Sequence, residues 1–109
     1  MRSAAAEDLI FHALADPSRR AIFESLVRGE LAVKDLTARF DISQPAVSQH
    51  LATLRNAGLV SGRSEGRCIY YRVEPKGLKP LADWLSHYRA FWTDRLGRLD
   101  ALLEKLEDP

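Results

Sequence analysis

Cysteine, long hydrophobic runs and net charge are all scarce in this sequence, and each shortage excludes a class of protein. One cysteine in 109 residues cannot form an internal disulfide or a zinc cluster of cysteines. The longest uninterrupted hydrophobic run covers residues 68–71, whereas a membrane-spanning helix needs about 20 such residues. Glu7 and Asp8 follow three alanines, so we expect no secretory signal. The net charge of +1 argues against a polybasic or acidic tail.

Patterns typical of catalysis are also missing. The chain has no glycine-rich phosphate loop, no metal-ligand set and no nucleophile–base pattern. We therefore expect no enzymatic activity, no cofactor, no metal and no membrane partner. The hydrophobic content of 46% is still enough for an ordinary core, so the sequence predicts a single small domain over residues 1–109, located in the cytoplasm.

Capping and breaking residues divide the first half of the chain into helices. A first helix is expected over about residues 4–15, because its apolar residues recur at helical spacing. Asp16 and Pro17 form the next helix start, since aspartate caps well and proline fits the first turn. This second helix ends near Gly29. A third, short helix is marked by Val33, Leu36 and Phe40.

A helix-turn-helix and a hairpin follow. Residues 41–43 interrupt the helical pattern as a three-residue turn, and Ser43 is a good N-cap for a fourth helix that ends at Gly58. The period then changes from helical to alternating, which predicts strands over 59–64 and 67–73 with Glu65–Gly66 as the turn. On the second strand Ile69, Tyr71 and Val73 should face one way, and Cys68, Tyr70 and Arg72 the other. The helices (about 33–57) and the hairpin (about 59–73) together predict a winged helix-turn-helix.

The last part of the chain predicts a long amphipathic helix over about residues 76–106. Its apolar residues recur at alternating steps of three and four, which is close to a heptad seam. This helix exceeds what a winged helix core needs, and its aromatic residues would be exposed unless a second copy covered them. We therefore expect a homodimer with these interface residues: Leu9, Leu81, Trp84, Leu85, Tyr88, Phe91, Trp92, Leu96, Leu99 and Leu103. The expected fold class is mainly α with a small β-hairpin wing, in the order ααααββα, dimeric through the first and last helices.

The exposed side of the fourth helix carries the side chains expected to bind double-stranded DNA. Hydroxyl, amide and imidazole groups can hydrogen-bond to base edges in the major groove, and none of them repels phosphate. The expected contacts of this recognition helix are Ser43, Gln44, Pro45, Ser48, Gln49 and His50. The expected wing contacts, to phosphate or the minor groove, are Arg63, Ser64 and Arg67. Residues 43–73 contain four arginines and one glutamate, a net charge of +3 within a nearly neutral chain.

Four motifs in order resemble the ArsR/SmtB family of bacterial transcriptional repressors. They are FHALADPSRR at 11–20, SQPAVSQHL at 43–51, LRNAGLV at 54–60 and GRCIYYR at 66–72, within a resemblance that covers about residues 8–106. The resemblance implies a homodimeric winged helix protein that represses promoters, often its own, by binding an inverted-repeat operator. In this family a metal or another inducer usually triggers release.

Neither metal-sensing motif of that family is intact here. The arsenic-type motif Glu-Leu-Cys-Val-Cys-Asp-Leu corresponds to residues 30–36, where Ala32 and Lys34 replace both cysteines. The zinc-type motif on the last helix needs a histidine two positions after Asp83, where Leu85 stands. Two alternatives are not excluded by the sequence. One is a different metal site formed by His12, Asp83 and His87, and the other is a redox response of Cys68. The inducer, the operator and the regulated genes are not determined by the sequence.

Two alternatives share this fold. One is a metal- or redox-responsive derepressor, and the other is a winged helix that binds protein rather than DNA. The second would not need Arg63 and Arg67 beside a helix face without acidic residues. Salt dependence separates DNA binding from protein binding, because each phosphate contact releases counterions.

Overall fold

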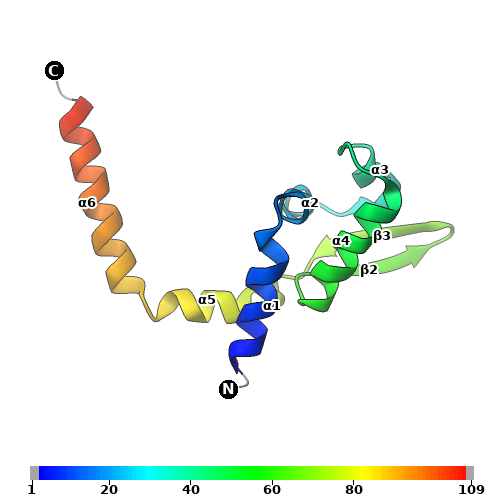
Figure 1. The fold of residues 1–109 in the computed structure, drawn as a ribbon, viewed down its shortest axis with the longest axis horizontal. Coiled ribbons are helices and arrows are strands. Elements are labelled where there is room, and N and C mark those ends of the chain that lie inside the picture. The colour runs from blue at the N-terminus through cyan, green and yellow to red at the C-terminus, as the bar shows by residue number, and fades with distance from the viewer. Residues whose placement is uncertain (1–2, 108–109) are drawn as a thin grey trace.

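A computed structural model describes residues 3–107, with side chains from residue 6 onward. In chain order the elements are α1 (Ser3–Ala15), α2 (Pro17–Val27), β1 (Leu31–Ala32), α3 (Val33–Thr37), α4 (Gln44–Asn56), β2 (Val60–Glu65), β3 (Cys68–Val73), the 3-10 helix η1 (Pro75–Leu78), α5 (Lys79–Ser86) and α6 (Arg89–Glu107). The expected fold class, mainly α with a small hairpin wing, is confirmed (Figure 1). None of the described helices is long and apolar enough to cross a membrane.

The junction between α1 and α2 is held by capping. The Asp16 carboxylate accepts a hydrogen bond from the Arg19 amide at 2.9 Å, and Pro17 occupies the first turn of α2. Arg19 Nε donates to the Ala13 carbonyl oxygen at 2.8 Å, so one arginine satisfies an unpaired carbonyl at the end of α1. The expected helix start at Asp16–Pro17 is therefore confirmed, and it determines how α1 leads into α2.

One hydrophobic core lies among α1, α2, α3, α4 and the base of the wing. Its largest fully buried side chains are Ile10, Ile22, Leu26, Leu36, Val47, Leu51, Leu54 and Leu59. Burying a side chain of this size contributes about 1.5–3 kcal/mol, so these residues dominate the stability of the domain. Every described element from α1 to β2 presents at least one side chain to this core or packs against it.

The helix-turn-helix differs from the expectation in the length of its turn. Helix α3 ends at Thr37, and residues 38–43 separate it from α4, so the expected three-residue turn is wrong. The amides of Arg39 and Phe40 donate to carbonyls three residues back rather than four. This tighter bonding ends the α-helix before Phe40, which packs against the core from the turn.

The wing is a three-stranded antiparallel sheet in the order β1–β3–β2, rather than a simple hairpin. Leu31 pairs with Tyr71, and this short first strand was not expected. Glu65 pairs with Cys68, so Gly66 and Arg67 form the turn, one residue later than expected. Gly66 has φ +63°, which L-residues rarely adopt and which suits the first central position of a type II′ turn.

The two faces of β3 follow the expected alternation near its base. Tyr71 and Val73 pack against the core, whereas Ile69, near the tip, is 47% exposed. The strand therefore extends beyond the core before it reaches the turn. The tip of the wing projects away from the domain (Figure 1).

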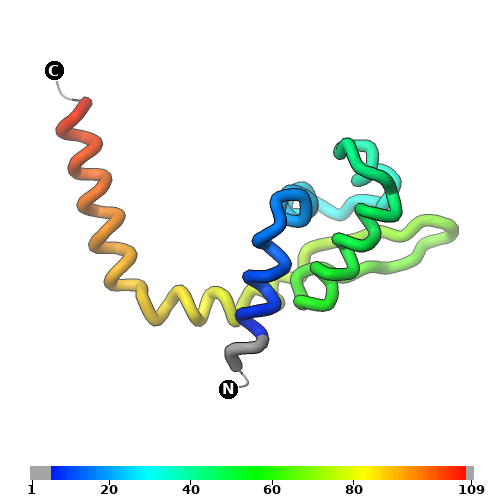
Figure 2. Tube along the Cα trace, in the orientation of Figure 1, coloured from blue at the N-terminus to red at the C-terminus, as the bar shows by residue number. Residues whose placement is uncertain are grey.

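The C-terminal segment is two helices rather than the single helix expected over 76–106. Helix α5 ends at Ser86, and the amides of His87 and Tyr88 donate to carbonyls three residues back. Figure 2 shows the chain turning sharply there, with α6 leading away from the rest of the fold. Leu81 holds α5 against the core, but every side chain of α6 is exposed. Among the described residues, α6 therefore makes no buried contact with the core.

Candidate nucleic-acid interface

Helix α4 is positioned by a cap and a buried stripe. The Ser43 hydroxyl accepts a hydrogen bond from the Ala46 amide at 3.3 Å, which starts the helix. Val47, Leu51 and Leu54 are each completely buried, so they determine which side of α4 faces the core. The opposite side faces solvent, as a DNA-recognition helix requires.

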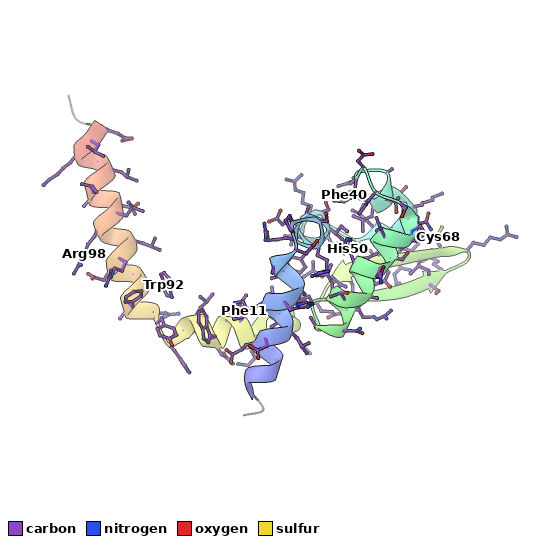
Figure 3. The ribbon with its side chains drawn as sticks, in the orientation of Figure 1. Phe11, Phe40, His50, Cys68, Trp92 and Arg98 are labelled. Atoms are coloured by element: carbon purple, nitrogen blue, oxygen red, sulfur yellow. The ribbon has the colours of Figure 1, made fainter. Side chains whose placement is uncertain are left out.

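Five of the six residues expected to contact DNA from this helix lie on its exposed side. They are Ser43, Gln44, Pro45, Ser48 and Gln49. His50 is half-buried on another flank, close enough to Asp16 for its charge to influence that carboxyl. The pKa of Asp16 is lowered mainly by the hydrogen bond from the Arg19 amide, with a smaller contribution from His50. Figure 3 labels His50 on the side of α4 toward α1 and α2, and Cys68 on the side toward the wing.

Arg63 in the wing is engaged by acidic residues. Its guanidinium forms a two-pronged pair with Glu30, with Nε and Nη2 donating at 3.0 and 2.9 Å. It also pairs with Glu65 and lies over the Tyr70 ring at 4.8 Å. The hydrogen bond from Arg63 lowers the pKa of Glu30, and the same contacts raise the pKa of Arg63. Arg63 therefore fastens the wing to the segment between α2 and β1.

Arg72 is engaged in a similar way at the base of the wing. It pairs with Glu74 at 3.4 Å, and the Ser61 hydroxyl donates to the same carboxylate at 2.5 Å. The Ser61 hydrogen bond is the main reason that the pKa of Glu74 is lowered. Two of the four arginines in residues 43–73 therefore have acidic partners, which the charge count alone did not reveal.

Arg67 has a different environment at the tip. It lies in the two-residue turn, is exposed, and has no ion pair among residues 3–107. Ser64 is also exposed, near the end of β2. The structure thus places Arg67 and Ser64 where they can contact a ligand, whereas Arg63 would have to exchange its carboxylate partners first.

A groove between α3, α4 and the wing contains a residue that the sequence reasoning missed. Lys34 lines it together with Gln44, Ser48, Arg67 and Cys68. In the sequence, Lys34 stands where the arsenic-type motif has a cysteine, and nothing there indicates a contact with DNA. Its position one residue into a short helix before the recognition helix was the available signal, but only the packing of β3 against α3 shows that Lys34 approaches Arg67.

The residues expected at the dimer interface lie on α1, α5 and α6, with Tyr88 in the turn between the last two. Trp84 packs edge to face on Phe11 at 5.4 Å, and Trp84 and Tyr88 are 5.3 Å apart. Leu81 instead packs partly against its own core. The others stay substantially exposed in the protomer: Leu9, Leu85, Tyr88, Phe91, Trp92, Leu96, Leu99 and Leu103. Trp84, Tyr88, Phe91 and Trp92 line an open apolar hollow of about 300 Å³.

The residues considered for a metal site are not gathered into one. The Asp83 carboxylate is held by Lys79 Nζ at 3.0 and 3.1 Å. His87 lines the same shallow depression as Asp83, but His12 does not. Within the described part of the chain, no three His, Cys, Asp or Glu residues lie close enough to hold a metal ion.

Comparisons with known proteins agree on one family. Residues 16–61 match the family model described as "Bacterial regulatory protein, arsR family". The HTH-type transcriptional regulator Rv2034 of Mycobacterium tuberculosis is 42% identical over 101 residues, which are 93% of this chain and 92% of that protein. The transcriptional repressor SdpR of Bacillus subtilis is 33% identical over 79 residues, 72% of this chain and 88% of that protein.

The fold has solved counterparts as well. An ArsR-like transcriptional regulator from a Rhodococcus species matches with a TM-score of 0.73 and 30% sequence identity. The match covers 94% of this chain and 96% of that one, so it includes the C-terminal helices as well as the helix-turn-helix and wing.

Proposed function

Because the chain belongs to the ArsR family of DNA-binding transcription regulators, we propose that it acts as a homodimeric repressor that binds an inverted-repeat operator. Proteins of this family are regulators rather than enzymes. The observation that carries the proposal is the exposed side of α4. Gln44, Ser48 and Gln49 face solvent there with no acidic residue among them, and the first two line a groove shared with the wing. The DNA partner also supports the cytoplasm as the place of action.

Recognition of bases is assigned to the polar side chains of α4. Glutamine can form two hydrogen bonds with adenine in the major groove, and serine can bond to several base edges. The buried stripe keeps these side chains facing outward, because rotating the helix would expose Leu51 and Leu54 to water. Arg67 at the wing tip is assigned to phosphate, which positions the protein without reading sequence.

Dimerisation is assigned to the apolar surface of α1, α5 and α6. Helix α6 has no buried residue in the protomer, yet Trp92, Leu96 and Leu99 follow one another at helical spacing along it. A contiguous apolar surface of this kind indicates an interaction site. A second copy related by a two-fold axis would cover it and would place the two α4 helices about 34–36 Å apart, one turn of DNA.

The decisive experiment is footprinting of the purified protein on the DNA upstream of its own gene. We expect protection of an inverted repeat whose half-sites are centred about one helical turn apart. Sedimentation of the complex should give two chains per operator. Binding of every duplex with equal affinity, or a single protected half-site with one chain, would refute the proposal.

A salt titration of the same complex distinguishes the remaining alternative. Contacts to roughly four to eight phosphates predict that log K falls with log salt with a slope of about −3.5 to −7. A slope near zero, with no preference for any duplex, would favour the protein-binding winged helix.

A further inference from the structure

The groove between α3, α4 and β3 has a composition that suits an anion. Its volume is about 320 Å³, room for several water molecules. Lys34 enters from α3, Arg67 from the turn before β3, and the polar side chains of Gln44 and Ser48 from α4. No carboxylate is among the residues that line it.

The two cations of this groove differ from the other basic groups of the wing. Arg63 is paired with Glu30 and Glu65, and Arg72 is paired with Glu74. Lys34 and Arg67 take part in none of the ion pairs formed within residues 3–107. Two unpaired cations from elements more than thirty residues apart in sequence therefore meet at one place.

We propose that this groove receives a phosphate of the DNA backbone, held by Lys34 and Arg67. The inference rests on the proposed function, because the groove shares Gln44 and Ser48 with the reading side of α4. DNA bound along that side would bring its backbone across the groove. Lys34 is thereby a DNA-contacting residue outside both the recognition helix and the wing.

The chemistry of the two side chains supports a shared phosphate. Arginine offers a planar pair of donors to two phosphate oxygens, and lysine adds a compact charge with rotatable donors. Such a contact fixes the register of the protein on the duplex and carries no sequence information. Removing either side chain should therefore lower the affinity for operator DNA and the affinity for random DNA by the same factor.

The first test measures the salt slope of operator binding for Lys34→Ala, Arg67→Ala and a matched control, Lys105→Ala. Lys105 is an exposed lysine near the end of α6, and the end of that helix lies far from α4 (Figure 1). Each groove variant should flatten the slope, by at most about 0.9 per protomer or about 1.8 for a dimer because the two cations share one phosphate, and the control should leave it unchanged. Affinity for random DNA should fall by the same factor as affinity for the operator.

The second test uses Cys68, the only cysteine of the chain, as a reporter in the groove. Its rate of alkylation by a maleimide should fall at least tenfold when the protein is saturated with operator DNA.

Circular dichroism of each variant in the first test checks that the fold is retained. We expect this because Lys34 and Arg67 are both exposed.

The outcomes separate this inference from the proposed function. If the wild-type protein binds no duplex, the proposed function fails, and this inference fails with it. If the wild-type protein binds with a steep slope, but Lys34→Ala has the wild-type slope or Cys68 reacts equally fast with and without DNA, the groove assignment alone is overturned.

Discussion

Replacing Gly77 by alanine should destabilise the domain strongly, because the backbone of η1 passes very close to the end of α4. A Cβ atom at Gly77 would lie 1.7 Å from the Gly58 carbonyl oxygen. Carbon and oxygen ordinarily approach to about 3.3 Å, so the two segments would have to separate by roughly 1.6 Å. Neither contact atom is a flexible side chain that could move aside, and the backbone must shift.

The magnitude follows from what that shift disturbs. The Glu74 amide donates to the Leu59 carbonyl oxygen at 2.9 Å, between the same two segments. Overpacking costs about 1–3 kcal/mol, and loss of one hydrogen bond costs about 1 kcal/mol. We therefore expect a loss of about 2–4 kcal/mol in the free energy of unfolding. For a domain of this size that lowers Tm by at least about 8 °C.

The matched control is the same substitution at Gly97. Nothing lies within 4 Å of a Cβ built at that position, which is inside α6. Alanine there should stabilise the helix by about 0.5–1 kcal/mol. Thermal melts followed by circular dichroism, all at one protomer concentration because association shifts Tm, should therefore move in opposite directions. Two variants that melt together, or a Gly77→Ala protein as stable as wild type, would refute the reasoning.

Three further predictions concern the interfaces and caps. Trp92→Ala should raise the dimer dissociation constant at least tenfold in analytical ultracentrifugation, since Trp92 lines the open apolar hollow of α5 and α6; a variant that stays dimeric at nanomolar protein contradicts this. Ser43→Ala should cost about 1 kcal/mol in urea unfolding, because it removes the cap of α4, while Ser64→Ala should be neutral. Glu30 has a lowered pKa in the folded protein, so its stabilising pair is complete above about pH 5 and is lost as pH falls below about 4. The difference in unfolding free energy between wild type and Glu30→Gln should shrink over that acidic range, and a difference independent of pH would be inconsistent with the pair.

Features that depend on nearby residues were readable from the sequence. The caps at Asp16 and Ser43 act on amides three residues away, and both were expected. The helical spacing of Val47, Leu51 and Leu54 predicted the buried side of α4 and, with it, the exposed residues opposite. Alternation in residues 68–73 predicted a strand. Each of these signals is local, because capping and periodicity follow from backbone geometry over a few residues.

The ends of helices and strands that depend on which of two hydrogen bonds forms were harder to predict from the sequence. The sequence placed the hairpin turn at Glu65–Gly66, but pairing of Glu65 with Cys68 moves it to Gly66 and Arg67. It also predicted one C-terminal helix, because the apolar spacing continues unbroken through residues 87 and 88. The spacing of side chains does not reveal whether an amide bonds three or four residues back, and that choice separates α5 from α6.

The sequence by itself determined the winged helix class and the exposed polar side of α4, since both follow from local periodicity and capping. Only the tertiary structure decided which cations are free. Arg63 and Glu30 are 33 residues apart and meet because β1 and β2 both pair with β3, so a charge count could not show that Arg63 is occupied. Lys34 and Arg67 meet at one groove for the same reason. Long-range contacts depend on how the elements pack, and packing therefore decides which basic side chains have acidic partners and which are available to bind DNA.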